Sequence, residues 1–534
     1  MEIPAKIGRE KLAPLRWIHS AELGRLEGWV TKNSTWLALA TIASAFALRF
    51  AYCDLCYLNP DEAQHFYAAA QSSWLETYKA AFTLAHPPLF ILVLHGVLFL
   101  GRTELILRLP SLVGGTTALW LTFAWIRRSL GEVPALAGLV FMALSPAAIS
   151  SSTEVRQYGL LLCSVCGALY ATERTFTARS TLWAIVQELF LVCALLTHYT
   201  AIVVIISLGS FVLLRSLFDT VPHRVLFTFC MSQLVLATLL GWLYFGHVRG
   251  KIPFGAGSSM DYLRPYFYAR QNETWFTFTW RALSGTFSYA GSHRSAFLFM
   301  LVFIAGVGGI ATGRTRARRL QALLLISPFI AGFAAAVFQV FPFAGSRHQT
   351  YLLPFLAAGV SAFAACAPRG WAVPLLMAGV VIAPLWVTHA RPDNDPRTTP
   401  LSDMTAAIEY VKATVPQGTP LFVDYETRDE LRYYLTRNDT NLDTVRFNAG
   451  VEERLGGYRV VVPRGYVWSF RSNEVLKQVT ESARALGVPG GDPLWVVSTS
   501  WTEPPLASRP PAGGDRQVKE FGRISVIKVL SQEH

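Results

Sequence analysis

Long apolar segments recur along most of the chain and predict membrane-spanning helices. Several windows contain no Lys, Arg, Asp or Glu: 110–126, 133–153, 225–246, 320–346 and 370–390. Each is close to or above the roughly 17–20 apolar residues that a helix needs to cross hydrocarbon. Residues 391–534 are rich in charges and turn formers instead. The pattern predicts a polytopic α-helical membrane protein with one appended soluble domain.

The basic loops between the apolar segments orient the predicted spans, because Lys and Arg stay on the cytoplasmic side. With the basic N-terminus inside, the first span runs outward. Segment 86–101 offers only about 15 apolar residues, so we expect it to lie along the outer interface. About eleven transmembrane helices result. They are 35–52, 110–126, 133–150, 158–172, 181–197, 199–216, 225–245, 295–312, 320–341, 349–366 and 371–389.

Three regions follow from this threading: a cytoplasmic basic N-terminus (1–34), a transmembrane domain (35–390) and a soluble extracytoplasmic domain (391–534). Residues 246–294 form a large, aromatic-rich external loop. In the C-terminal region helix and strand patterns alternate, which predicts a small α/β layer. The expected helices are 403–414, 427–436 and 473–486, and the expected strands are 421–423, 458–462, 494–498 and 524–530.

Composition supports this class of protein. Hydrophobic residues make up 52% of the chain and charged residues only 15%, which is too apolar for an ordinary soluble protein. The net charge of +12 comes from basic residues clustered between apolar segments, so we attribute it to membrane orientation rather than to nucleic-acid binding. None of the seven cysteines lies in the C-terminal region, and their scatter indicates no disulfide framework.

Polar groups from several separate segments converge on the predicted outer face. Ionisable groups at this depth are costly and mark functional sites, so we regard them as candidates. They are Asp61, Glu62, His65, His86, Arg108, Glu154, Arg156, Tyr158, His198 and Arg347.

Structural interpretations remain open for several of these residues. Asp61 and Glu62 suit the first turn of an interfacial helix, where acids are favoured. Arg108 suits a side chain that reaches to the interface. Glu154 and Arg156 suit an external ion pair. His198 suits a helix-end histidine as well as a ligand.

The order of the motifs resembles a known family. The acidic pair after the first span is followed by HPPLF (86–90), ELILRLPS (104–111), LSPAAISSSTEVRQYGL (144–160), LTHYT (196–200) and SRHQTYLLP (346–354). This series is similar to the bacterial branch of the protein mannosyltransferase-like superfamily (family 39 type), which are membrane glycosyltransferases of the GT-C fold. The resemblance covers residues 35–215 well and 340–360 weakly.

The resemblance implies a multi-pass enzyme of the bacterial inner (cytoplasmic) membrane that serves the cell envelope, with an extracytoplasmic active site. Such enzymes transfer a sugar from a polyprenyl-phosphate carrier to a hydroxyl acceptor. The family's acidic pair carries over to Asp61 and Glu62, and its phosphate-binding arginine to Arg108. The family pattern EAR-x-Y appears as Glu154-Val155-Arg156-Gln157-Tyr158, and a lysine of some relatives is His86 here.

The chemistry is reasonable from the residues alone. A sugar hydroxyl needs a base, and a carboxylate within hydrogen-bond reach can remove its proton, for which we choose Asp61 with Glu62 as its support. A lipid phosphate leaving group needs fixed cations, for which Arg108, Arg156 and Arg347 are candidates in that order.

Direct displacement would invert the anomeric centre, whereas a nucleophilic Glu154 would retain it. We predict no cofactor beyond the donor and no required metal, since the spacing of Glu62, His65, His86 and His198 matches no standard zinc or calcium motif. A lipid-sugar transporter or flippase, an oligosaccharide polymerase or ligase, and a non-catalytic assembly protein remain alternatives.

Overall fold

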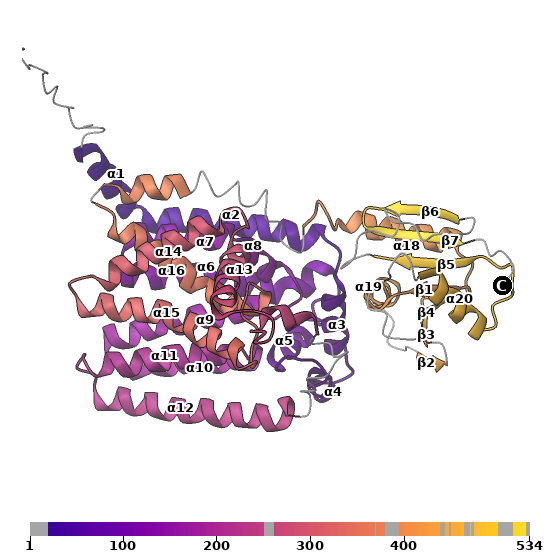
Figure 1. Ribbon diagram of the computed structural model, residues 1–534, viewed down its shortest axis with the longest axis horizontal. Helices are drawn as coiled ribbons and strands as arrows, with labels where there is room; N and C mark the ends of the chain where they lie inside the picture. Colours follow the sequence, from indigo (N-terminus) through magenta and orange to yellow (C-terminus); the bar gives the residue numbers. More distant parts are fainter. Residues whose placement is uncertain are drawn as a thin grey trace, which may run out of the picture.

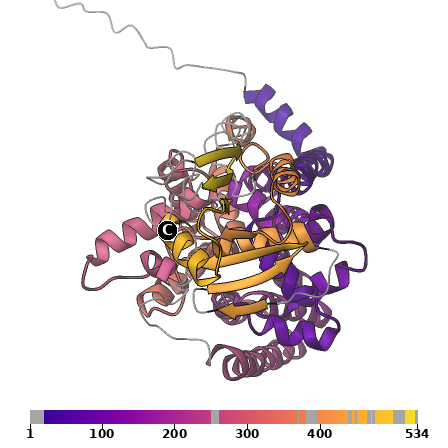
Figure 2. The same cartoon turned by 90° about the vertical axis from the view of Figure 1, so that its right-hand side faces the viewer.

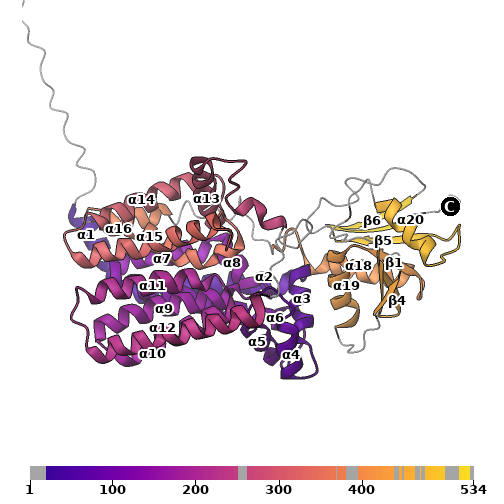
Figure 3. The same cartoon turned by 60° about the horizontal axis from the view of Figure 1, so that its bottom comes forward.

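The computed structural model describes residues 20–249, 261–368, 370–379, 395–437, 444–447, 450–463, 470, 475–499 and 516–529. They form a helical bundle and a smaller C-terminal domain placed at one end of it (Figures 1 and 3). Viewed end-on, the sheet of the C-terminal domain lies in front of the bundle (Figure 2). The α-helical membrane architecture and the sheet-containing C-terminal domain predicted from the sequence are thereby confirmed.

The bundle consists of long apolar helices joined by short connections. Its helices are α1 (Ser20–Lys32), α2 (Ser34–Leu55), α3 (Pro60–Ala69), α4 (Trp74–Ala81), α5 (Leu89–Val97), α6 (Glu104–Leu130), α7 (Glu132–Leu144), α8 (Pro146–Thr153), α9 (Tyr158–Ala178), α10 (Thr181–Thr197), α11 (Ala201–Ser216), α12 (His223–Leu243), α13 (Trp275–Ala290), α14 (Ala296–Ala311), α15 (Arg316–Val337) and α16 (Leu353–Cys366). Short turns of other helix types are η1 (Tyr244–Val248), η2 (Asp261–Tyr266) and η3 (Arg347–Leu352).

Length and composition identify fewer spans than the sequence predicted. Within the described residues, five helices are long and apolar enough to cross a membrane, or six if the bent pair α7–α8 counts as one span. Helices α10, α11 and α14 are apolar but shorter. Most of the expected span 371–389 lies outside the described residues. The chain is a multi-pass membrane protein, and the prediction of about eleven helices stays a prediction.

Two expected elements have a different form in the structure. The single span expected at 133–150 is broken into α7 and α8, which meet at an angle of 60°. Ser145 and Pro146 cause the break, because a proline at the first position of α8 starts a new helix. The expected external loop 246–294 contains the helix α13, which begins with a Thr274 cap. Helix α5 has nine residues and is too short to cross a bilayer, as the sequence suggested.

The C-terminal domain is a mixed sheet covered by helices. Its strands are β1 (Pro420–Val423), β2 (Thr444–Phe447), β3 (Gly450–Leu455), β4 (Tyr458–Pro463), β5 (Leu494–Ser498), β6 (Arg516–Phe521) and β7 (Ile524–Val529), in the order β2-β3-β4-β1-β5-β7-β6. Its helices are α18 (Leu401–Thr414), α19 (Tyr425–Thr436) and α20 (Val475–Ala485). Strand β1 pairs in parallel with β4 and β5, and the outer pairs are antiparallel.

Candidate active site

The segment Asn59-Pro60-Asp61-Glu62 begins helix α3 with a complete capping box. The Asn59 side chain accepts a hydrogen bond from the Glu62 amide at 2.9 Å, and the Glu62 carboxylate accepts one from the Asn59 amide at 2.9 Å. Pro60 occupies the first turn, where its missing N–H costs nothing. This geometry turns the two adjacent acids in different directions. Glu62 is fully buried, whereas the Asp61 side chain is 30% exposed.

Glu62 forms a buried, bidentate ion pair with Arg108 of α6. Arg108 Nε lies 2.8 Å from Glu62 Oε1, and Arg108 Nη2 lies 2.9 Å from Glu62 Oε2. The remaining guanidinium hydrogen bonds go to the carbonyl oxygens of Cys53, Cys56 and Tyr57. Five donated hydrogen bonds match the five N–H groups of an arginine. No N–H of Arg108 is left for a phosphate.

The carboxylate oxygens of Glu62 also accept all their hydrogen bonds from groups within the protein. Besides the bonds from Arg108 and Asn59, its Oε1 accepts a hydrogen bond from the Val155 amide at 2.7 Å. The structure therefore favours a structural role for Glu62 and Arg108 over the catalytic and phosphate-binding roles expected from the sequence. Together they join the start of α3 to α6 and to the connection between α8 and α9.

Asp61 lies between two arginines from distant parts of the chain. Its Oδ2 pairs with Arg156 Nη1, and Arg347 Nη2 approaches the same oxygen at 2.8 Å. Burial acts to raise the pKa of the Asp61 carboxyl, but the charges of Arg156 and Arg347 outweigh it and hold this pKa well below its usual range. Asp61 is therefore an ionised carboxylate at neutral pH.

The connection between α8 and α9 delivers Arg156 to this position. The Ser111 hydroxyl of α6 donates a hydrogen bond to the Arg156 carbonyl at 2.7 Å. The guanidinium lies over the Tyr158 ring, 5.6 Å from its centroid. Glu154 is buried beside it and accepts a hydrogen bond from the Ser150 hydroxyl. Arg156 is only 3% exposed, which makes its ion pair with Asp61 much less screened by water than a surface pair.

A row of aromatic rings continues from Asp61 into the protein. The ring centroids of His65 and His86 are 6.0 Å apart, those of His86 and His198 5.4 Å, and those of His198 and His348 5.7 Å. The Tyr158 ring lies 5.5 Å from His198. His65 Nδ1 contacts the Asp61 carbonyl at 2.6 Å. Residues of α3, α9, η3 and two loops thus meet around one polar centre.

Several buried polar atoms of this centre have no hydrogen-bond partner among the described residues. They are Arg156 Nε, His65 Nε2, His198 Nε2, His348 Nε2 and both amide atoms of Gln157. Buried polar atoms are nearly always satisfied in folded proteins, so a group of unsatisfied ones indicates a place for water or a ligand. The donors here are mainly cationic or imidazole nitrogens, which suits an anionic ligand.

The histidines of the centre are neutral in the free protein. Burial, with the positive charge of Arg156, lowers the pKa of His65 to about 4. Burial and the charges of Arg156 and Arg347 lower the pKa of His198 to about 3. Burial likewise places the pKa of His86 well below its usual value. An anion in this centre would act in the opposite direction and favour the protonated rings.

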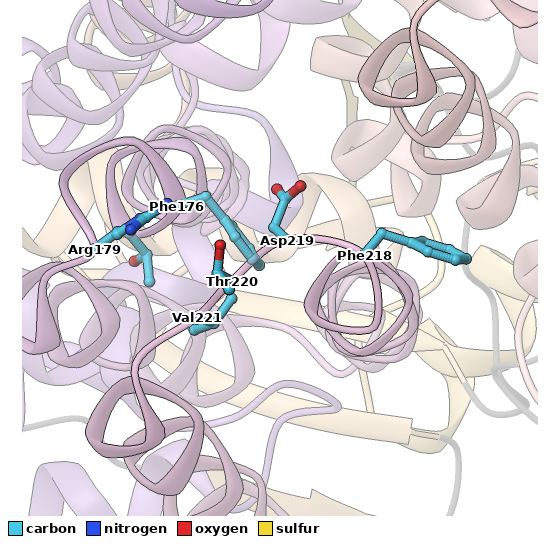
Figure 4. Close-up of a pocket in the computed structure, with 7 residues that line it drawn as sticks. Phe176, Arg179, Phe218, Asp219, Thr220 and Val221 are labelled. Atoms are coloured by element: carbon cyan, nitrogen blue, oxygen red, sulfur yellow. The ribbon is translucent and has the colours of Figure 1, made fainter.

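No metal centre is formed by the described part of the chain: nowhere in it do three or more His, Cys, Asp or Glu side chains come together so that they could hold a metal ion. A cavity of about 330 Å³ lies between the C-terminal end of α9 and the loop after α11 (Figure 4). It is lined by Phe176, Arg179 and Asp219, among others. Helix α9 starts at Tyr158 and has 21 residues, so about 30 Å separates this cavity from the polar centre.

The structure gathers most of the sequence-predicted residues but separates their roles. One polar centre is formed by Asp61, Arg156, Arg347, His86 and His198. Glu62 and Arg108 form a separate, fully buried ion pair that holds the start of α3 in place. Tyr158 and Glu154 flank Arg156. The sequence analysis assigned no substrate role to His65 or His348, and it named Ser111 and Gln157 only as members of their motifs, without a role. The adjacency of His348 to Arg347 and of Gln157 to Arg156 was the available signal.

Part of the chain matches a family of known proteins. Residues 85–245 match the family described as dolichyl-phosphate-mannose-protein mannosyltransferase, and this segment contains His86, Arg108, Arg156 and His198. The chain is a GT-C-type membrane protein that resembles the protein mannosyltransferases. This GT-C-type chain has no match among curated protein sequences. The family match supports glycosyl transfer as the general activity of the GT-C-type protein.

The fold is similar to that of solved membrane proteins. ArnT from Cupriavidus metallidurans in the apo state matches with a TM-score of 0.50 and 14% identity, over 94% of this chain and 98% of that one. ArnT bound to undecaprenyl phosphate matches with a TM-score of 0.49 over the same shares, also at 14% identity. The Archaeoglobus fulgidus oligosaccharyltransferase, tethered with an acceptor peptide, matches with a TM-score of 0.46 and 10% identity, over 88% of this chain and 70% of that one.

Proposed function

We propose that this protein is a glycosyltransferase that moves a sugar from a polyprenyl-phosphate donor to a hydroxyl acceptor on the extracytoplasmic face of the membrane. The carboxylate of Asp61, held between Arg156 and Arg347 in a buried polar centre, is the observation that carries this proposal. A base and an anion-binding pair at one point are what transfer from a lipid phosphate requires. The acceptor is a hydroxyl of a lipid, a glycan or a protein.

The donor phosphate binds to Arg156 and Arg347 in this proposal. Guanidinium groups match phosphate oxygens with paired hydrogen bonds, and the Nε of Arg156 is buried without a hydrogen-bond partner among the described residues. His86 and His198 lie beside each other in the same centre, and in this proposal their imidazole nitrogens bind the remaining phosphate oxygens. Tyr158 holds Arg156 through its ring. Arg108 has no free N–H and takes no part in binding.

The reaction proceeds by direct displacement. The acceptor oxygen attacks the anomeric carbon, the bond between that carbon and the phosphate oxygen breaks, and the acceptor proton passes to Asp61. The polyprenyl phosphate leaves with the electron pair of the broken bond. Arg156 and Arg347 stabilise its developing charge in a site with little water, where fixed cations are most effective. The displacement inverts the anomeric centre.

Donor binding also strengthens the base. In the free protein both arginines neutralise Asp61, so its carboxylate binds protons weakly. A donor phosphate competes for the same two guanidinium groups and weakens their pairing with Asp61. The pKa of Asp61 then rises toward its usual value, which makes it a better proton acceptor. Glu154, buried and bonded to Ser150, serves the shape of the Arg156 loop rather than acting as a nucleophile.

The test is to supply the purified full-length protein with three donor classes and to measure product release. These are polyprenyl-phosphate sugars, polyprenyl-pyrophosphate oligosaccharides and nucleotide sugars. We expect release of polyprenyl phosphate from the first class alone. Use of the pyrophosphate donor would favour the polymerase or ligase alternative, and release from no lipid donor would contradict enzymatic transfer.

A matched pair of arginine variants tests the binding site. Arg347 and Arg281 are similarly exposed, at 32% and 38%, and each pairs with a carboxylate at 2.8 Å. We expect Arg347→Gln to raise the donor KM at least about tenfold, because a charge-assisted hydrogen bond to phosphate contributes roughly 1.5–3 kcal/mol. Arg281→Gln should leave the donor KM unchanged. Equal effects of the two variants would remove Arg347 from the donor site.

A further inference from the structure

The C-terminal domain contacts the helix that carries Asp61. Helix α19 lies against α3, although more than 350 residues of sequence separate the two (Figure 3). Gln64 of α3 donates a hydrogen bond to Asp429 of α19 at 2.8 Å. The rings of Phe66 and Tyr433 meet edge to face at 5.1 Å. These contacts make α19 a direct neighbour of the proposed catalytic helix.

The backbone that leads into α3 is held by the same domain. Cys56 forms a β-bridge with Pro400, and the Tyr57 amide donates to the Thr399 carbonyl at 3.1 Å. The next amide, that of Leu58, donates to the hydroxyl of Tyr434 at 2.9 Å. Three successive residues are therefore fixed immediately before the capping box of α3. Their position sets where the first turn of α3 begins.

From the opposite side, the bundle holds the same turn. Arg108 donates to the carbonyl oxygens of Cys53, Cys56 and Tyr57 and to the Glu62 carboxylate. Arg108 thus fixes the carbonyl groups of this segment, and the C-terminal domain fixes its amide groups. Along the chain, Asp61 lies between this anchored segment and the anchored Glu62. A shift of either set moves the Asp61 carboxylate relative to Arg156 and Arg347.

We propose that the C-terminal domain positions the catalytic base, with Tyr434 as the positioning residue. This inference rests on the proposed role of Asp61. The Tyr434 hydroxyl accepts the hydrogen bond of a backbone amide three residues before Asp61, and its ring lies 4.8 Å from that of Tyr433. Tyr433 in turn donates to the Arg102 carbonyl at 2.7 Å, which fixes α19 to the start of α6. The domain therefore acts as a second support for α3.

The first test is Tyr434→Phe, which removes the hydroxyl and keeps the ring. We expect kcat to fall about tenfold, because small displacements of a reacting group reduce the rate strongly, up to about 10² for 1 Å. The donor KM should stay within about twofold, since the donor contacts come from other elements. Tyr410→Phe is the matched control, because Tyr410 of α18 packs against Phe521 of β6. It should leave both constants unchanged.

A second pair of variants tests the contact from the side of α3. Gln64→Glu places a carboxylate against Asp429 and should lower kcat in the same way, because the two like charges repel. Adding Asp429→Asn supplies an amide that can donate to the new carboxylate. We expect this double variant to recover at least half of the lost kcat. Recovery would show that the contact itself matters, and not the identity of either side chain.

The outcomes separate this inference from the proposed function. A normal kcat in both Tyr434→Phe and Gln64→Glu overturns the positioning role, whatever Asp61→Asn does. A fall in kcat that only matches the loss of folded protein, followed by thermal unfolding, also overturns it. If Asp61→Asn keeps full activity, the assignment of the base fails, whereas the absence of transfer from any lipid donor contradicts the proposed function itself. A lowered kcat with unchanged donor KM and melting temperature supports the inference.

Discussion

Two neighbouring acids in the first turn of α3 have opposite surroundings. Glu62 is fully buried and takes up the guanidinium of Arg108, whereas Asp61 is 30% exposed and shared by Arg156 and Arg347. The helix geometry explains this, because successive residues point in directions about 100° apart. The ion pair of Glu62 and Arg108 is buried, and every N–H group of Arg108 donates a hydrogen bond within the protein, so this pair has a structural role. The ion pairs of Asp61 lie beside buried nitrogen atoms that have no hydrogen-bond partner among the described residues, so Asp61 is the candidate for a catalytic role.

This difference predicts opposite effects of two arginine variants. Arg108→Met leaves Glu62 buried without its counter-charge, so we expect the free energy of unfolding to fall by about 3–5 kcal/mol. Arg347→Gln removes a partly exposed pair and should change the stability by less than about 1 kcal/mol. Thermal unfolding of the purified variants in detergent measures both. Equal destabilisation would contradict the distinction between the supporting pair and the reactive pair.

The buried histidines predict a loss of stability in mild acid. The pKa values of His65 and His198 are lowered to about 4 and about 3 in the folded protein, against about 6.5 in an unfolded chain. Between about pH 6.5 and 4 the unfolded chain binds more protons, so the stability must fall as the pH falls. The melting temperature should drop over this range. His198→Gln should reduce the slope, and parallel slopes for wild type and variant would contradict this prediction.

At the residue level the sequence predicted the members of the site better than their functions. Asp61, Arg156 and Arg347 could be found because ionisable residues at the edges of apolar segments are rare and conspicuous. The ion pair between Glu62 and Arg108 could not be predicted, because the two residues are 46 positions apart in the sequence and meet only through the packing of α3 against α6. No sequence spacing encodes that distance.

At the level of elements, the break between α7 and α8 shapes the site. Arg49 is fully buried in α2 and donates hydrogen bonds to the carbonyl oxygens of Met142 and Ala143, at 3.1 and 3.0 Å. These carbonyls lie at the end of α7 and lack partners within the helix. The Ser145 hydroxyl bonds to the Ala290 carbonyl and fixes the bend. Helix α8 then leads directly to the Arg156 loop.

The cap formed by Arg49 predicts the effect of its removal. Arg49→Leu fits an apolar environment but leaves two buried carbonyl oxygens without donors, so we expect a destabilisation of about 2–4 kcal/mol. We also expect lower transfer activity, because the direction of α8 sets the place of Arg156. Arg127→Leu, at the exposed end of α6, is the control. Thermal unfolding and a transfer assay give both quantities, and wild-type values for Arg49→Leu would contradict the capping role.

The sequence predicted elements well where their hydrophobic pattern is strong. The spans around α6, α12 and α15 follow from apolar windows without charges. The α7–α8 break was missed because the window 133–153 contains no charged residue and the Ser145-Pro146 pair was not taken as its end. Strands β3 and β6 were missed because their sequences, GVEERL and RQVKEF, carry several charged residues and few apolar ones, as strands near a sheet edge do.

At the level of the whole molecule, the position of the C-terminal domain is the main result that the sequence could not provide. Both domains were expected, yet nothing in the sequence of α3 or α19 predicts that Gln64 meets Asp429 or that Leu58 meets Tyr434. These contacts join residues that are more than 300 positions apart in the sequence, and no local motif marks either partner. Only the folded arrangement shows that the domain lies at the end of the bundle that carries α3, the helix of Asp61 (Figure 1).

This arrangement predicts the membrane orientation of exposed residues. If the C-terminal domain is extracytoplasmic, a cysteine in place of Lys519 of β6 should react with a membrane-impermeant maleimide in intact cells. A cysteine in place of Arg179, at the far end of α9, should react only after the membrane is opened. The wild-type protein controls for labelling of the native cysteines. The reverse pattern would place the site on the cytoplasmic side.

The most direct test of the account is sugar transfer by Asp61→Asn, compared with Asp54→Asn in the same membranes. Asp54 is an exposed acid at the end of α2, seven residues before Asp61, so its variant controls for the loss of one carboxylate. With a polyprenyl-phosphate sugar as donor, we predict that Asp61→Asn lowers the rate at least about a hundredfold, as the loss of a general base does. Asp54→Asn should keep the wild-type rate. Full activity of Asp61→Asn would contradict the assignment of the base.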